Sequence, residues 1–125
     1  MMENALILIV EDDEKSRRLM RDVLQHQGYL VTETDQSEIG IELIRKLNPA
    51  LVLMDIHLPG MSGLDAIREI RNDVSIAGTC VVAVTASVMG NVREKVREAG
   101  FDGFEQKPLN LQAFLSTVKR LVPVH

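Results

Sequence analysis

The stretch LVLMDIHLPG, residues 51–60, decides how the chain folds and where its chemistry lies. Four apolar residues open it after Asn48-Pro49, a pattern typical of a short strand buried on both faces. The strand runs directly into Asp55, and Pro59-Gly60 then turns the chain away. Ligands of open parallel sheets bind beyond the carboxyl ends of the strands. Asp55 is therefore a candidate functional residue, although a lone Asp at a strand end more often caps a helix or forms a turn.

Four other apolar runs alternate with helical patterns on either side of this stretch. Together with residues 51–54, the expected strands are residues 5–10, 29–34, 80–84 and 101–105. Strict alternation of strands and helices requires a parallel sheet covered by helices on both faces, with right-handed crossovers. The sequence therefore predicts a doubly wound α/β fold in a single domain, residues 1–125, with the polar strand 29–34 at a sheet edge.

The second expected helix follows that edge strand. Asp35 or Ser37 can cap its first turn, because both side chains accept hydrogen bonds from backbone amides there. Ile39, Leu43 and Leu47 recur at four-residue spacing and are expected to form its buried stripe.

Composition and charge exclude several classes of protein. With 125 residues, 46% hydrophobic and 26% charged, the chain is expected to bury a core of its own. Its apolar runs are too short to cross a membrane, and its first residues lack the basic and apolar segments of a secretion signal. These features and the single cysteine, Cys80, suit a cytoplasmic protein. A net charge of −4 and only four aromatic residues argue against direct nucleic-acid binding.

Polar side chains follow four of the expected strands. They are Glu11-Asp12-Asp13, Asp55, Thr85-Ala86-Ser87 and Lys107-Pro108. Because parallel strands share one carboxyl edge, all four groups are expected on the same rim. Crowded carboxylates repel one another unless a cation lies among them, and Mg²⁺ suits a partly open site of one or two carboxylates. Lysine and threonine can bind phosphoryl oxygens, so the rim has the parts needed for an aspartyl-phosphate.

The same residues carry a family resemblance. The chain resembles the receiver domain of two-component response regulators over essentially its full length, and in particular the stand-alone, single-domain regulators. The matching motifs are IVEDD at 9–13, MDIHLPGMSG at 54–63, VTA at 84–86 and KP at 107–108. The resemblance implies a flavodoxin-like fold with strand order 2-1-3-4-5 and a Lys107–Pro108 peptide bond that is often cis.

The resemblance also implies roles for the acidic residues. Asp55 corresponds to the phosphate acceptor. Glu11 and Asp12 correspond to the acidic pair that holds Mg²⁺, Asp12 directly and Glu11 through water. The backbone carbonyl of His57 corresponds to a further metal ligand, so its imidazole need not bind metal.

A switch is implied by the same correspondence. Thr85 and Lys107 match the hydroxyl and the cation that are drawn to the phosphoryl group, and Phe104 matches an aromatic side chain that turns inward on activation. The surface from the fourth helix to the fifth, roughly residues 90–121, would then change for partners. The fourth helix is expected to move easily because its apolar stripe is thin. That stripe is Val88, Val92 and Val96.

The resemblance leaves the setting of the domain open. It implies a histidine kinase or histidine phosphotransfer protein as phosphodonor, a downstream protein that binds the switch surface, and the option of a homodimer. The chain could be a stand-alone regulator or a receiver domain from a hybrid histidine kinase or DNA-binding regulator. A turnover phosphatase of the haloacid-dehalogenase type is disfavoured, because the second carboxylate of its Asp-x-Asp motif would be His57 here. We therefore expect a phosphoacceptor rather than a turnover enzyme.

Overall fold

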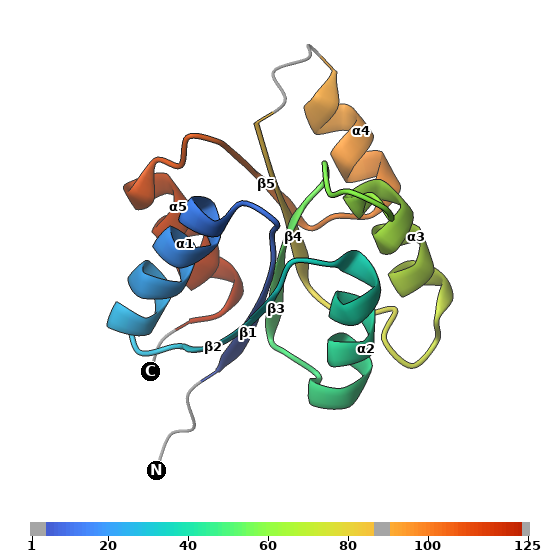
Figure 1. The fold of residues 1–125 in the computed structure, drawn as a ribbon, viewed down its shortest axis with the longest axis horizontal. Helices are drawn as coiled ribbons and strands as arrows, with labels where there is room; N and C mark the ends of the chain where they lie inside the picture. The colour runs from blue at the N-terminus through green and yellow to red at the C-terminus, as the bar shows by residue number, and fades with distance from the viewer. Residues whose placement is uncertain (1–4, 87–90, 124–125) are drawn as a thin grey trace.

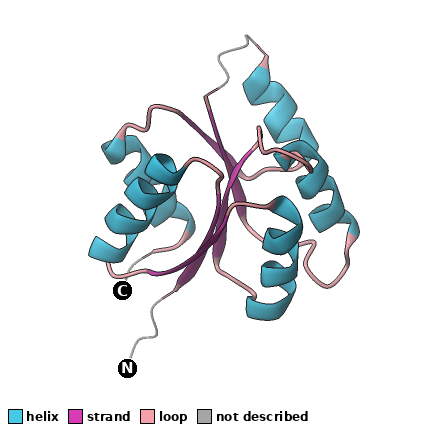
Figure 2. Cartoon of the chain, in the orientation of Figure 1, coloured by secondary structure: helices cyan, strands magenta, loops and turns pink. Residues whose placement is uncertain are grey.

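A computed structural model describes residues 5–86 and 91–123 of the chain. Five parallel strands in the order β2-β1-β3-β4-β5 alternate with five helices in these residues (Figures 1 and 2). The strands are β1 (Leu6–Val10), β2 (Leu30–Thr34), β3 (Leu51–Asp55), β4 (Val81–Thr85) and β5 (Gly103–Gln106). The helices are α1 (Glu14–His26), α2 (Ser37–Leu47), α3 (Gly63–Asn72), α4 (Val92–Ala99) and α5 (Leu111–Leu121). The predicted flavodoxin-like fold and its strand order are confirmed.

The central strands of the sheet are more deeply buried than its edge strands. Every residue of the central strands β3 and β4 is buried, as their continuous apolar sequences predict. The edge strands β2 and β5 are partly exposed, so the expectation of an edge at the polar second strand is confirmed.

Two layers of helices cover the sheet, with α1 and α5 on one face and α2, α3 and α4 on the other (Figure 1). Each face has a core of its own, because side chains alternate between faces along a strand. Ile7, Leu51 and Phe114 belong to the α1–α5 side. Leu8 and Ile67 belong to the opposite side. No helix within residues 5–86 and 91–123 is long and apolar enough to cross a bilayer.

Helix α2 departs from its prediction. Its N-cap is Gln36, which makes no side-chain capping bond, so neither Asp35 nor Ser37 caps it. Its buried face is formed by Ser37, Gly40, Ile41 and Ile44. Ile39 and Leu47 of the predicted stripe are exposed, and Leu43 is only partly buried.

Close packing of α2 on the sheet explains which face is buried. A Cβ atom added at Gly40 would lie 2.9 Å from Val10 Cγ2, so the helix backbone itself contacts β1 at this point. The predicted and observed stripes both have helical spacing, and only the glycine contact distinguishes them.

The β4–α4–β5 region is shifted from its predicted bounds. Strand β5 begins at Gly103 rather than residue 101, because Phe101 is buried before the strand and Asp102 receives the backbone amide of Val81 at 2.8 Å. Helix α4 begins at Val92 and ends at Ala99, with Gly100 as its C-cap. Ser87, Val88 and Gly90, named in the expected loop and helix, lie outside the described residues.

Arg71 of α3 ties α3 to the end of α4. Its guanidinium donates to the carbonyl oxygen of Gly100 at 2.7 and 3.0 Å and to that of Thr79 at 2.6 Å. It also pairs with the Asp102 carboxylate at 2.9 Å. These contacts fix the C-terminal end of α4 against the sheet.

Candidate functional site

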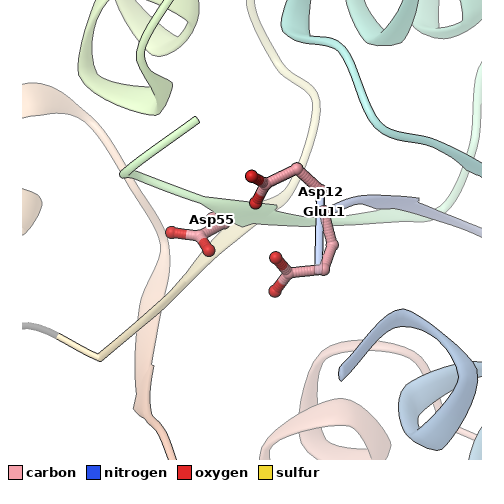
Figure 3. Close-up of side chains that lie close together, drawn as sticks. All are labelled: Glu11, Asp12 and Asp55. Carbon is pink, nitrogen blue, oxygen red and sulfur yellow. The ribbon is translucent and has the colours of Figure 1, made fainter. Parts of the chain in front are cut away.

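The site lies at the carboxyl ends of β1 and β3. Val10 pairs with Met54 in register, so the next residue of each strand, Glu11 and Asp55, reaches the same rim of the sheet. Asp12 follows immediately. Carboxylate oxygens of Glu11, Asp12 and Asp55 lie within 4.8 Å of one another, and Figure 3 shows the three side chains together beyond the strand ends. The structure thus brings together the acidic residues that the sequence places on one rim.

Lys107 supplies the positive charge at this rim. It follows β5, and its backbone amide donates to the carbonyl oxygen of Thr85 at 2.8 Å. Its side chain reaches back across the strand ends, so that Nζ lies 2.9 Å from Asp55 Oδ2 and 2.5 Å from Glu11 Oε1. The Lys107–Pro108 peptide bond is cis, as expected. One ammonium group therefore bridges two of the three carboxylates.

Glu11 is the most deeply placed of these acids. Its side chain is fully buried, and its Oε2 accepts a hydrogen bond from the Asp13 backbone amide at 3.1 Å. Burial raises the pKa of Glu11 from its ordinary 4.5 to about 7, against the opposing effect of Lys107. Burial lowers the pKa of Lys107, but its hydrogen bonds to Glu11 and Asp55 outweigh burial and leave that pKa raised.

The Asp55 carboxylate is held by two donors. Oδ1 accepts the backbone amide of His57 at 2.8 Å, and Oδ2 accepts Lys107 Nζ at 2.9 Å. Asp55 is 6% exposed, whereas Asp12 and His57 are exposed. The acceptor candidate is thus oriented by its neighbours and nearly buried, while Asp12 and His57 beside it are exposed at the rim.

The remaining predicted residues lie on the β4 and β5 side of the site. Thr85 ends β4 and is fully buried. Phe104, in the middle of β5, is half-buried and packs against the core on the α2–α4 side. The guanidinium carbon of Arg93, from α4, lies 5.1 Å from the centre of the Phe104 ring, a cation–π contact. The roles assigned to Thr85, Phe104 and Lys107 stay predictions.

Gly63 is a residue of the site whose role the sequence did not reveal. It is the first residue of α3, after the N-cap Ser62. A Cβ atom added to it would lie 2.6 Å from both the carbonyl oxygen of Asp55 and Cα of Ile56. Its amide donates to the Ile56 carbonyl at 3.1 Å. The start of α3 therefore presses directly on the backbone of Asp55, and only glycine leaves room for this approach.

Comparison with known proteins identifies the family. Residues 7–119 match the family model described as the response regulator receiver domain. The chain belongs to this family. It is 34% identical over 113 residues to the polar-differentiation response regulator DivK of Brucella ovis, covering 90% of this chain and 92% of that protein.

Solved structures agree with this assignment. The receiver domain of the sensor histidine kinase PA1611 from Pseudomonas aeruginosa has a TM-score of 0.87 and 25% identity, covering 98% of this chain and 100% of that one. A magnesium ion is coordinated in the active-site cleft of that structure. The chemotaxis protein CheY4 of Vibrio cholerae, at 22% identity and a TM-score of 0.87, shares the fold over 96% of this chain and 100% of its own.

The acidic cluster fits the Mg²⁺ site of a receiver domain. Its donors are carboxylate oxygens, the ligand type that Mg²⁺ prefers, and they come from Glu11, Asp12 and Asp55. Asp12 is exposed, which leaves the site open to the water molecules that Mg²⁺ usually keeps. A divalent cation would also relieve the repulsion among three neighbouring carboxylates.

Substitution of Gly63 tests its contact with the Asp55 backbone. Gly63→Ala is expected to lower the free energy of unfolding by about 1–3 kcal/mol, because the added methyl group displaces backbone atoms. Gly78→Ala is the matched control, since a Cβ atom there has nothing within 4 Å. Urea unfolding of the two variants measures the difference. Equal stability of Gly63→Ala and Gly78→Ala would contradict the contact.

The raised pKa of Glu11 predicts a pH-dependent stability in the absence of metal. Between pH 4.5, where the unfolded chain loses this proton, and about 7, the folded protein binds more protons. Its free energy of unfolding therefore falls as pH rises through this window. Relative to Glu11→Gln, the wild type is expected to lose about 3 kcal/mol across this window, measured by urea unfolding with a chelator present. Parallel pH profiles for the two proteins would show that folding does not raise the pKa of Glu11, and would contradict this prediction.

Proposed function

We propose that this receiver domain accepts a phosphoryl group on Asp55 from a histidine kinase or a histidine phosphotransfer protein. The position of the Asp55 carboxylate carries the proposal. It stands at the open rim of the sheet, 2.9 Å from Lys107 Nζ and beside the carboxylates of Glu11 and Asp12. A nucleophilic carboxylate, a fixed cation and an acidic site for a metal ion are the parts that phosphoryl transfer needs.

The transfer itself is a displacement at phosphorus. A carboxylate oxygen of Asp55 forms a bond to phosphorus, while the bond to the donor's imidazole nitrogen breaks and that nitrogen keeps the electron pair. The hydrogen bonds from His57 and Lys107 hold the carboxylate in one orientation. Asp12 would bind Mg²⁺ directly, Glu11 through water, and His57 through its backbone carbonyl. The bound ion supplies positive charge that neutralises the phosphoryl oxygens.

Phosphorylation of Asp55 is proposed to change the positions of Thr85 and Phe104. In this proposal the new phosphoryl oxygens attract the Thr85 hydroxyl and Lys107, and Phe104 turns inward. Two surface hollows flank Phe104, one toward Val96 and Phe101 and the other toward Pro108 and Thr117. Phe104 and Arg93 both line the two hollows. Movement of the Phe104 ring would break the contact with Arg93 and change the surface of α4, β5 and α5.

That surface is the proposed docking site for a downstream protein, and it could also form a homodimer. The relatives of this chain include a response regulator and the receiver domain of a sensor histidine kinase. The domain is therefore proposed to work either alone or within a longer kinase or regulator, in the cytoplasm. It would support its own phosphorylation and dephosphorylation without acting as a turnover enzyme.

Intact mass measurement tests the acceptor directly. After incubation with Mg²⁺ and acetyl phosphate, the wild type is expected to gain a single phosphoryl group. Asp55→Asn, which keeps the shape of the side chain, should gain none. Asp22→Asn, an exposed carboxylate on α1, should behave as the wild type. An unmodified wild type, or an adduct that persists in Asp55→Asn, would contradict the proposal.

A further inference from the structure

We infer that Arg17 is a positioning residue for the metal-binding carboxylate of Asp12, an inference that rests on the proposed Mg²⁺ site. Arg17 lies in α1, just beyond the turn that carries the acidic pair. Its Nη1 donates to the backbone carbonyl of Glu11 at 2.9 Å, and its Nε pairs with Glu33 Oε1 at 3.3 Å. The guanidinium therefore joins the turn after β1 to the neighbouring strand β2.

The carbonyl of Glu11 controls where Asp12 points. This carbonyl belongs to the planar peptide unit that joins Glu11 to Asp12. A hydrogen bond that fixes the direction of the carbonyl therefore fixes the orientation of the whole peptide plane, which leads into Asp12. The other backbone group of Glu11, its amide, donates to the Thr34 carbonyl at 3.0 Å. With the hydrogen bond from Arg17, both the amide and the carbonyl of Glu11 are held by hydrogen bonds.

The two acidic ligands are restrained in different ways. Glu11 is buried, and its own carboxylate is held by Lys107 and the Asp13 amide. Asp12 is exposed, and the peptide unit before it sets the position of its Cα atom. Groups that orient metal ligands typically change metal affinity by about 10–100-fold when removed. Arg17 is placed to have such an effect through the backbone.

The guanidinium of Arg17 is itself well anchored. Its side chain is 21% exposed, and its partner Glu33 lies on β2 opposite Ile9 of β1. Glu33 also pairs with Nη1 of Arg21, one turn later in α1, at 3.0 Å. Arginine suits this position because its planar fork reaches two acceptors at once. The one negative charge of Glu33 offsets part of the charge of the two arginines.

Arg21 provides the matched control for an experiment. Both arginines pair with Glu33, but the contact with the Glu11 carbonyl is made by Arg17. A titration of the full chain with MgCl₂, followed by the backbone amide signals of residues 12 and 57, gives the dissociation constant. Arg17→Gln is expected to weaken Mg²⁺ binding about tenfold, and Arg21→Gln to stay within about twofold of the wild type. Arg17→Lys, which can reach one acceptor at a time, should give an intermediate value.

The thermal unfolding temperature separates positioning from simple stabilisation. If Arg17 only stabilises the fold, Arg17→Gln lowers that temperature but binds Mg²⁺ as the wild type does, and the inference is overturned. Tighter binding by Arg17→Gln would also overturn it, since that result would reveal charge repulsion.

Asp12→Asn serves as the reference for the site. Should Asp12→Asn lose Mg²⁺ while Arg17→Gln keeps it, the proposed metal site stands and the role of Arg17 fails. A wild type that binds no Mg²⁺ at residues 12 and 57 would overturn both.

Discussion

Three carboxylates that would repel one another in isolation meet at the carboxyl edge of the sheet, and one ammonium group bridges two of them. Glu11 follows β1 and Asp55 ends β3, and the register of these neighbouring strands places the two residues side by side. Lys107 reaches both from the far side of the site. The single positive charge of Lys107 faces two of the three carboxylates, and Asp12 remains exposed at the rim. The proposed metal binding and phosphoryl transfer would both make use of that imbalance of charge.

The rest of the molecule keeps this cluster in place and connects it to the surface. The buried strands β1 and β3 hold the backbone of Glu11 and Asp55 at the edge of the sheet. Gly63 lets the start of α3 press on the Asp55 backbone, and Arg17 holds the peptide that leads into Asp12. On the other side, Lys107 and Phe104 belong to the same short segment around β5. Lys107, which contacts Asp55, is therefore only three residues from Phe104 on the α4–β5 surface, and the proposed switch would use this short connection.

The sequence predicts much of this arrangement because its signals are local. Apolar runs identify the strands, and their polar ends place Asp55 and Lys107 on one rim once the strands are parallel. The face of α2 could not be predicted, since Ile39 and Ile41 both belong to stripes with helical spacing and only the packing of the helix on the sheet selects between them. The role of Gly63 is equally hidden, because its neighbour Asp55 is brought to it by tertiary structure. Contacts of this kind have no local signature in the sequence.

A crystal structure of the full chain grown with Mn²⁺, a substitute for Mg²⁺ that gives an anomalous signal, tests the central claim most directly. The account predicts one strong anomalous peak among the carboxylate oxygens of Glu11, Asp12 and Asp55, and its loss in Asp12→Asn. A saturated crystal with no peak there, or with its strongest peak elsewhere on the chain, would contradict the claim that this charge cluster is built around a divalent cation.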